Sequence, residues 1–415
     1  MQIRGSAVQS VVLMASVVIV ALNLRPSMAA VGPLLSAIRL ELPLGFGMAS
    51  LLTMLPVTAM GLAMFFGMGI ARRLGSHRTV TLSLCLIGLA SFARLFVDSA
   101  SELILSAVLA GLGIALIQAL MPTLIKTRFK TSVSLCMGLY VTAIMGGAAI
   151  AASFSPWVLS SSGSWRVGLA IWAVLAMVAL CLWLTQRGAM NVQTTQGPAS
   201  GSAGQDAFAR LPRAWMLGVF FGLGTAAYTC VLAWLAPYYV EHGWSEQDAG
   251  LLLGFLTVME VVSGLLIPAL ANRSRDKRLA LSVLLVLMMV GFLGLILMPQ
   301  SLSLLWACLL GLGIGGLFPM SLIVSMDHLE DPQRAGSLTA FVQGVGYLIA
   351  GLSPLLAGVI RDLSGSFTGA WWTLTGLVAL MLIMVLQLDP RRYADALPRT
   401  VLAASARGSA SAGHG

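Results

Sequence analysis

The tetrapeptide Gly111-Leu112-Gly113-Ile114 occurs a second time in the chain, as Gly311-Leu312-Gly313-Ile314. Other residues repeat at the same separation, which is about half the length of the chain. Ala49 and the pair Leu51-Leu52 return as Ala249 and Leu251-Leu252. A period this long excludes a solenoid of short repeats. It predicts that the protein consists of two homologous halves.

Apolar stretches fill both halves. A bilayer core is about 30 Å thick and a helix rises about 1.5 Å per residue, so a span needs roughly 20 apolar residues. The chain is 58% hydrophobic and only 9% charged, whereas soluble domains carry about 25% charged residues. We therefore predict an all-α polytopic membrane protein with twelve transmembrane helices in two six-helix pseudo-repeats, near residues 9–38, 48–70, 79–97, 102–125, 133–159, 165–185, 214–238, 248–271, 279–298, 302–325, 336–360 and 370–388.

The repeat and the local composition also predict the domain boundaries. Residues 1–185 and 214–388 would form the two bundles. Between them, residues 186–213 contain a Gly/Ser/Gln-rich run typical of a flexible linker, here a cytoplasmic one. Residues 389–415 end in Ala/Ser/Gly-rich sequence, which predicts a disordered cytoplasmic tail. Parallel repeats of this kind place a substrate site near the membrane midplane, between the halves.

The net charge of +9 would suit a nucleic-acid partner, but the positions of the basic residues exclude that interpretation. Most of the 24 Lys and Arg residues lie in loops on one side of the predicted topology, at 72–78, 126–130, 187–213, 273–278 and 391–407. This is the positive-inside pattern, and it predicts an inner-membrane protein with both termini in the cytoplasm. No phosphate-binding loop, redox motif or zinc motif occurs, so we expect neither an ATP-driven pump nor an enzyme, and no cofactor or metal.

The most informative polar residue is Arg25, in the stretch Ala21-Leu22-Asn23-Leu24-Arg25-Pro26-Ser27 of the first span. A mid-membrane arginine costs roughly 2.5–3.5 kcal/mol, and one retained there usually faces a wet cavity or a partner. Pro26 predicts a bend, because it removes a backbone donor and disfavours helical geometry at the preceding residue. The guanidinium would then suit a small anion, although a purely structural arginine is the alternative. Asn23 would be a second ligand or a cap for the bend.

Uncharged polar residues in other spans are further candidates for substrate binding. Gln118 and Gln343 have apolar counterparts in the repeat, Phe318 and Met145, as an asymmetric substrate would require. Interhelical hydrogen bonding is the alternative for both glutamines. Three tyrosines either line the pathway or belong to ordinary packing, namely Tyr140, Tyr228 and Tyr347.

Charged residues elsewhere in the spans suggest coupling or gating. Glu260 is the only acid well inside a span, where it would bind a transported proton or act as counter-ion to a basic group. Arg94 lies near Asp98 and Glu102, and a structural ion pair is the preferred interpretation over a functional one.

The pair Asp327-His328 closes the tenth span at its cytoplasmic end. Two interpretations of this pair are open. It could latch an inward gate, or it could only solvate the helix end.

Several stretches carry a family resemblance that extends over nearly the whole chain. They are Leu22-Asn23-Leu24-Arg25-Pro26, Val31-Gly32-Pro33-Leu34-Leu35, Gln118-Ala119-Leu120-Met121-Pro122, Asp327-His328 and Phe341-Val342-Gln343-Gly344. In these the chain resembles the cyanate permease group of the major facilitator superfamily, which includes nitroimidazole transporters. The resemblance implies alternating access and a small solute such as the cyanate anion. Arg25, Gln118 and Gln343 fall on motif positions and Arg94 fits the pattern, whereas a neutral polar residue is expected in place of Glu260.

We therefore expect a monomeric secondary carrier, surrounded by lipid, in which Arg25 attracts a small anion and Gln118 and Gln343 complete its hydrogen bonds. The alternative within transport is an exporter of a drug-like or heterocyclic compound, with or without proton coupling, for which Arg25 would be structural and the aromatic residues would bind. A membrane sensor is the alternative from another class. It would need a signalling domain, and the segments outside the spans are short.

Overall fold

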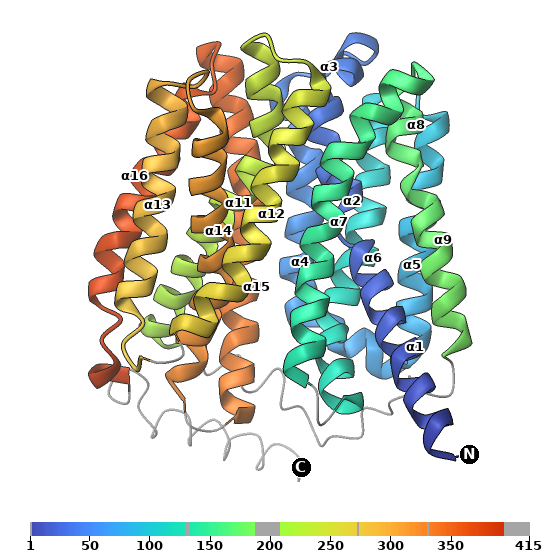
Figure 1. Cartoon of the computed structure of the whole chain (residues 1–415), viewed down its shortest axis with the longest axis vertical. Coiled ribbons are helices and arrows are strands. Elements are labelled where there is room, and N and C mark those ends of the chain that lie inside the picture. Colours follow the sequence, from blue (N-terminus) through green and yellow to red (C-terminus); the bar gives the residue numbers. More distant parts are fainter. Residues whose placement is uncertain (1, 130–132, 187–207, 272–273, 330–331, 394–415) are drawn as a thin grey trace, which may run out of the picture.

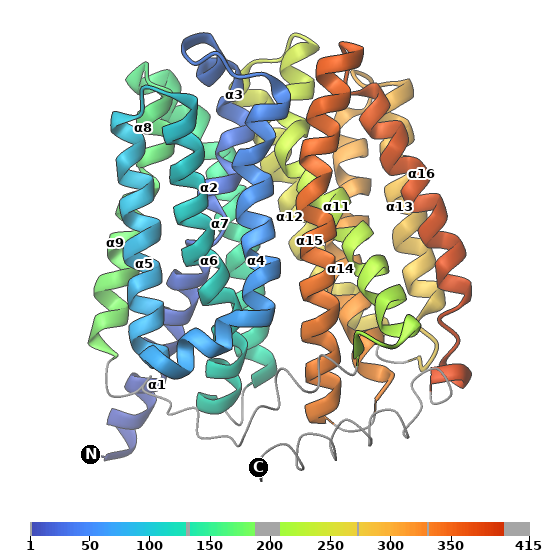
Figure 2. The same ribbon diagram turned by 180° about the vertical axis from the view of Figure 1, so that it is seen from behind.

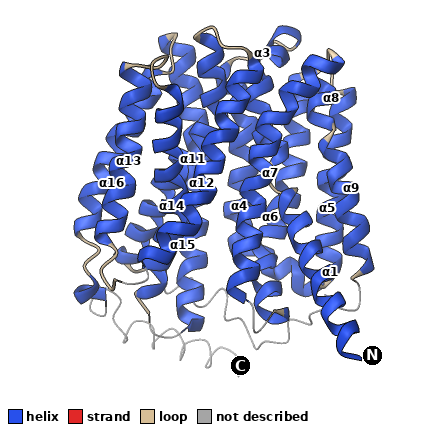
Figure 3. Ribbon diagram, in the orientation of Figure 1, coloured by secondary structure: helices blue, strands red, loops and turns tan. Residues whose placement is uncertain are grey.

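The computed structural model describes residues 2–129, 133–186, 208–271, 274–329 and 332–393 (Figure 1). Within these ranges all regular structure is helical and there is no strand (Figure 3). In the described part of the chain, twelve helical segments are long and apolar enough to cross a membrane. The predicted class and the predicted number of spans are confirmed.

The first half begins with a broken span and continues through five further spans. Its elements are α1 (Gln2–Leu22), α2 (Pro26–Ala29), α3 (Val31–Glu41), α4 (Phe46–Leu74), α5 (Ser76–Ala93), the 3-10 turn η1 (Arg94–Phe96), α6 (Ala100–Arg128), α7 (Val133–Ser162), α8 (Trp165–Ala170) and α9 (Trp172–Thr185). The second half comprises α11 (Pro212–Glu241), α12 (Glu246–Ala271), α13 (Arg278–Leu297), α14 (Ser303–Asp327), α15 (Pro332–Ser364), α16 (Thr368–Leu386) and the 3-10 turn η2 (Pro390–Arg392).

The halves stand side by side, one blue to green and the other yellow to red (Figures 1 and 2). The face at which α1 begins is called the lower face below, and the face with α3 and α8 the upper face (Figure 1). The halves meet where α4 packs against α15 and where α7 packs against α12.

The sequence repeat corresponds to a repeated packing arrangement. A Cβ atom at Gly111 would collide with Pro56 of α4, and one at Gly311 would collide with the backbone of Leu256 in α12. Two residues further along, Gly113 touches α5 and Gly313 touches α13 in the same way. Helix α6 therefore packs on α4 and α5 as α14 packs on α12 and α13. Small residues permit this close approach of helices in lipid.

Hydrogen bonds join the halves at the upper face. The Asp362 carboxylate, at the end of α15, accepts from the backbone N–H of Phe46 at 3.0 Å and of Gly47 at 2.8 Å, the first residues of α4. Glu246, at the start of α12, accepts from the backbone N–H of Ala37 in α3 at 3.0 Å. In each case a carboxylate of the second half binds backbone donors of the first.

The end of the chain differs from the expectation in one respect. The tail was predicted to be disordered from residue 389, but residues 389–393 form η2 and an ordered Tyr393. The Tyr393 ring stacks on His328 with 3.8 Å between ring centroids, and its hydroxyl donates to the carbonyl of Leu388 at 3.1 Å. Burial of this aromatic ring explains the order. The rest of the predicted tail, and residues 187–207 of the predicted linker, lie outside the described residues.

Candidate functional site

The first span breaks where the Arg25-Pro26 dipeptide predicts a bend. Helix α1 ends at Leu22 and α2 begins at Pro26, with Arg25 as its N-cap residue. The carbonyl of Arg25 accepts from the N–H groups of Met28 and Ala29. The carbonyl of Leu22 lies directly against Gly147 of α7, where any side chain would collide with it. Protein backbone thus covers the break, as non-helical backbone at membrane depth requires.

Asn23 stabilises this break. Its side-chain amide donates to the carbonyl of Ile19, one turn earlier in α1, at 2.8 Å, and to the carbonyl of Leu175 in α9 at 3.4 Å. Asn23 does not line the cavity described next. Asn23 was expected to be either a second ligand or a cap for the bend, and these contacts correspond to the cap.

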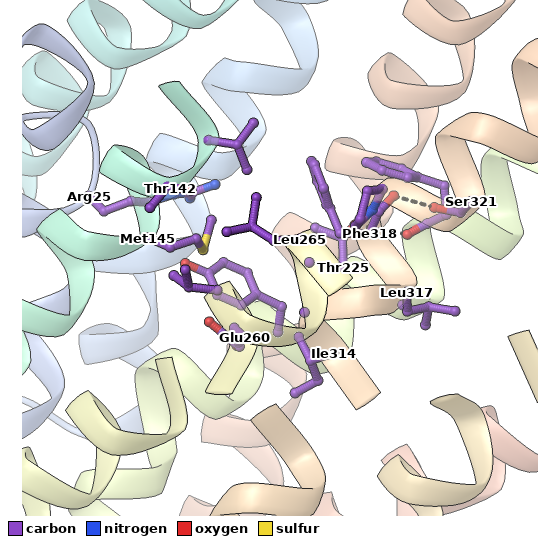
Figure 4. A pocket seen from close by; sticks show the side chains of 18 of the residues that line it. Arg25, Thr142, Met145, Thr225, Glu260, Leu265, Ile314, Leu317, Phe318 and Ser321 are labelled. Atoms are coloured by element: carbon purple, nitrogen blue, oxygen red, sulfur yellow. Dashed lines mark hydrogen bonds between the residues drawn. The ribbon is translucent and has the colours of Figure 1, made fainter. Parts of the chain in front are cut away.

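A cavity lies between the halves and next to the break. It encloses about 700 Å³, the space at its mouth included, and Figure 4 shows the side chains that line it. Its walls come from α7 (Val141 to Met145), α11 (Phe220 to Tyr228), α12 (Glu260 to Leu265) and α14 (Ile314 to Ser321), together with Arg25. On each of these helices the lining residues lie from the middle toward the lower end. The cavity therefore extends from the membrane midplane toward the lower face.

Arg25 lines this cavity, and two nitrogens of its guanidinium are buried without a hydrogen-bond partner among the described residues. Its side chain is only 3% exposed, and neither Nε nor Nη1 has a hydrogen-bond partner within the described ranges. The carbon Cζ lies 5.3 Å from the ring centroid of Tyr228, a cation–π distance. The charge of Arg25 also acts on Tyr140 and Tyr347, so tyrosines from α7, α11 and α15 surround it. The hydroxyls of Tyr140 and Tyr228 likewise lack partners in the described structure.

Glu260 brings a carboxyl group to the same cavity, from the second half (Figure 4). It is 3% exposed, and neither carboxylate oxygen has a hydrogen-bond partner among the residues described. Arg25 acts on it electrostatically, but no hydrogen bond joins the two groups. Gly315 of α14 fixes the position of Glu260, because the Glu260 backbone lies where a side chain of residue 315 would be.

The remaining lining is mostly aromatic and aliphatic, and sequence reasoning missed it. Phe221 and Phe318 pack against each other with centroids 5.3 Å apart, and Met145 and Leu265 complete this apolar wall. A few small hydroxyl groups from Thr142, Thr225 and Ser321 interrupt it. An apolar residue that faces a cavity looks the same in sequence as one that faces lipid, so no signal could have found these residues.

The two glutamines lie outside this lining. Gln118 of α6 is 9% exposed, and its Oε1 has no partner in the part of the chain that is described. Gln343 of α15 is partly buried. The structure therefore brings together Arg25, Tyr228 and Glu260, and it does not bring the glutamines to the same surface.

Arg94 differs from the expectation of an ion pair. It is fully buried, its Nε donates to Ser106 Oγ at 3.1 Å, and its Nη1 donates to the carbonyl of Ser27 at 3.0 Å. The acids expected to pair with it are engaged elsewhere. Asp98 lies 3.4 Å from Arg166, and Glu102 closes a capping box at the start of α6. Neutral acceptors reach Arg94 because the 3-10 turn η1 directs it into the bundle, away from the surface where the acids lie.

Asp327 and His328 lie at the lower end of α14. His328 Nε2 accepts from Arg213 Nε at 3.1 Å, and its Nδ1 lies 2.7 Å from the carbonyl of Val324. Burial lowers the pKa of His328 to about 4. Asp327 is exposed. Among the described residues, the partners of His328, including Tyr393, belong to the second half, so these contacts stabilise that bundle.

Comparisons with known proteins agree on one family. The family model described as Major Facilitator Superfamily matches residues 17–354. The cyanate transport protein CynX of Escherichia coli (strain K12) is 40% identical over 379 residues, which cover 91% of this chain and 97% of that protein. The 2-nitroimidazole transporter of the same organism is 32% identical over 378 residues, 91% of this chain and 94% of that protein. Among solved structures, the nucleoside transporter NupG superposes with a TM-score of 0.72 at 15% identity, covering 92% of this chain and 98% of that one.

Proposed function

Because this chain belongs to the major facilitator superfamily and its relatives are transporters, we propose that it is a secondary carrier of a small anion such as cyanate. One observation carries the proposal. The guanidinium of Arg25 faces a cavity between the halves with donors that no described residue uses. A planar fork of N–H donors in a poorly solvated site binds a small anion through charge-assisted hydrogen bonds. The 40% identity to a cyanate transport protein supports the choice of anion.

The membrane orientation follows from the basic loops. Where these loops are described, their basic residues lie at the lower face, for example Arg128, Arg213 and Arg278. We assign this face to the cytoplasm of a bacterial cell and propose that both termini lie on that side. The upper face would then be extracytoplasmic, and its cross-half hydrogen bonds close that end of the interface. The cavity accordingly extends from Arg25 toward the cytoplasm. Rocking of the halves about this site would present it to the other side.

A second candidate substrate is a small heterocyclic compound, which the protein would export. The aromatic and aliphatic wall of the cavity favours it, since rings such as Phe221 and Phe318 pack well against a flat apolar molecule. The similarity to a 2-nitroimidazole transporter supports this candidate as well. Proton coupling through Glu260 stays a prediction from the sequence, and a pH gradient imposed across a vesicle membrane would test it.

Counterflow in proteoliposomes tests the proposed function. Vesicles loaded with unlabelled cyanate should accumulate labelled cyanate from outside, and empty liposomes should not. Excess 2-nitroimidazole in the outer solution tests whether a heterocycle occupies the same site, because it should then inhibit cyanate uptake. Exchange of labelled 2-nitroimidazole without exchange of cyanate would replace the first candidate by the second. Exchange of neither compound would contradict both candidates.

A further inference from the structure

A guanidinium and a carboxyl group face one cavity from different halves and do not bond to each other. Arg25 approaches from the break between α1 and α2, and Glu260 from the middle of α12 (Figure 4). Both are nine-tenths buried or more. Throughout the described ranges, Nε and Nη1 of Arg25 and both oxygens of Glu260 are without partners. A charge at this depth normally has a partner.

The structure holds the two groups apart, which explains why no ion pair forms. The Tyr228 ring stands beside the guanidinium, and Tyr228 also interacts electrostatically with Glu260, so it lies near both groups. On the other side, the contact of the Glu260 backbone with Gly315 anchors α12 to α14. The cavity is therefore bounded by a donor fork in one half and by a carboxylate in the other. A molecule between them can satisfy both at once.

Resting on the proposed function, we propose that Glu260 determines specificity, and that the site selects small planar anions that also carry an N–H donor. The anionic group would bind the Arg25 fork, and the N–H would donate to the Glu260 carboxylate. The flat body of the molecule would lie against the ring of Tyr228 and the wall formed by Phe221 and Phe318. Each end of the bound molecule would then meet a complementary group of the protein: its anionic group would meet the guanidinium, and its N–H would meet the carboxylate.

An anion without an N–H donor can form only one of the two interactions that this site offers. Cyanate can occupy Arg25, but it carries no N–H that could donate to Glu260. Acceptor oxygens without a partner in a poorly solvated site are costly, whereas a hydrogen bond from the bound molecule offsets that cost. The N–H donor therefore adds affinity through Glu260, independently of the binding to Arg25.

A matched pair of ring anions tests the inference. Pyrrole-3-carboxylate and furan-3-carboxylate have the same charge and nearly the same shape, and only the pyrrole carries an N–H, on the far side of the ring from the carboxylate. In cyanate counterflow, the pyrrole acid should inhibit at a concentration lower by roughly tenfold or more, as a hydrogen bond to a charged group implies. In Glu260→Leu this difference should vanish while inhibition by the furan acid remains. Glu260→Gln, which keeps an acceptor oxygen, should retain part of the difference.

The outcomes separate this inference from the function on which it rests. Equal inhibition by the two acids in the wild type would overturn the role of Glu260 and keep the anion site, which the loss of cyanate counterflow in Arg25→Met tests separately. Cyanate exchange that neither acid inhibits would also overturn the inference. Absence of cyanate exchange would contradict the proposed function itself. The melting temperature of Glu260→Leu in detergent serves as the folding control, and it should not fall, because the replaced carboxylate has no partner in the described structure.

Discussion

Arg25 and Arg94 are both buried arginines of the first half, but their surroundings differ in kind. Arg94 is 0% exposed and donates to Ser106 and to the carbonyl of Ser27, and of its nitrogens only Nη2 has no partner among the described residues. Arg25, two residues before that serine, is 3% exposed and has two nitrogens without partners among the described residues. Both charges are expensive in a membrane. The difference teaches that the use of the donors, and not burial alone, distinguishes a structural arginine from a ligand-binding one.

The largest expected effect is a loss of transport on substitution of Arg25, which we do not expect for Arg94. Arg25→Met should lower the initial rate of cyanate counterflow by about 100-fold, because it removes charge-assisted hydrogen bonds that contribute about 3 kcal/mol to binding. Its melting temperature should stay the same or rise, since an uncompensated charge is lost. Arg25→Lys keeps the charge without the fork and should fall between Arg25→Met and the wild type. Wild-type transport by Arg25→Met would remove Arg25 from the site.

For Arg94 we predict the opposite result, a loss of stability without a loss of transport. Arg94→Met should lower the free energy of unfolding by about 2–4 kcal/mol, because it leaves the buried carbonyl of Ser27 without its donor and removes the bond to Ser106. Chemical denaturation in detergent measures this loss. Counterflow per folded molecule should stay near the wild-type value. A variant that is stable but does not transport would show that Arg94 also acts in the site.

A third arginine, Arg213, extends the comparison to pH. Its partner His328 has a pKa lowered by burial to about 4, and protonation would place an N–H of His328 Nε2 against the donor of Arg213. The unfolded chain takes up this proton near pH 6.5. Stability should therefore be highest above about pH 6.5 and fall as the pH drops toward 4, by roughly 1–3 kcal/mol. Melting temperatures between pH 7.5 and 4.5 measure the effect, and His328→Gln should flatten the curve relative to the wild type.

The smallest expected effect concerns the surroundings of Arg25. Tyr228→Phe keeps the ring 5.3 Å from the guanidinium and removes only a hydroxyl that has no partner in the described structure. Counterflow should stay within about twofold of the wild type. Tyr228→Leu removes the cation–π contact and should lower apparent affinity by an amount corresponding to about 0.5–2 kcal/mol. Equal behaviour of the two variants would indicate that the ring does not contribute.

The sequence alone predicted the scaffold and part of the site, for a physical reason. Lipid forces long apolar helices, so composition and the repeated Gly111 to Ile114 motif were sufficient for the spans. A charge inside an apolar run is conspicuous, and this identified Arg25 and Glu260, which the cavity brings together. Gln118 and Gln343 looked equally suitable, but a helix has several faces and sequence does not say which one meets the cavity.

Other features could not be predicted because they depend on contacts between distant segments. The ion pair expected for Arg94 was wrong, since the turn of η1 sets the direction of the side chain and no residue type announces that turn. Asp362 resembles any solvated charge at a helix end, and its bonds to Phe46 and Gly47 arise only when α15 meets α4. The ring of Tyr393 orders the start of the tail for the same reason.

The bonds of Asp362 to the first residues of α4 have a consequence for how easily the carrier can change state. Asp362 is exposed, so water can hydrogen-bond to its carboxylate and to the freed backbone N–H groups when the halves separate. Breaking these hydrogen bonds leaves no charge in the hydrocarbon, and forming them again does not require dehydration of a buried ion pair. Under the proposed rocking of the halves, bonds that water can replace favour a small free-energy difference between the two states, which the binding of a solute can reverse.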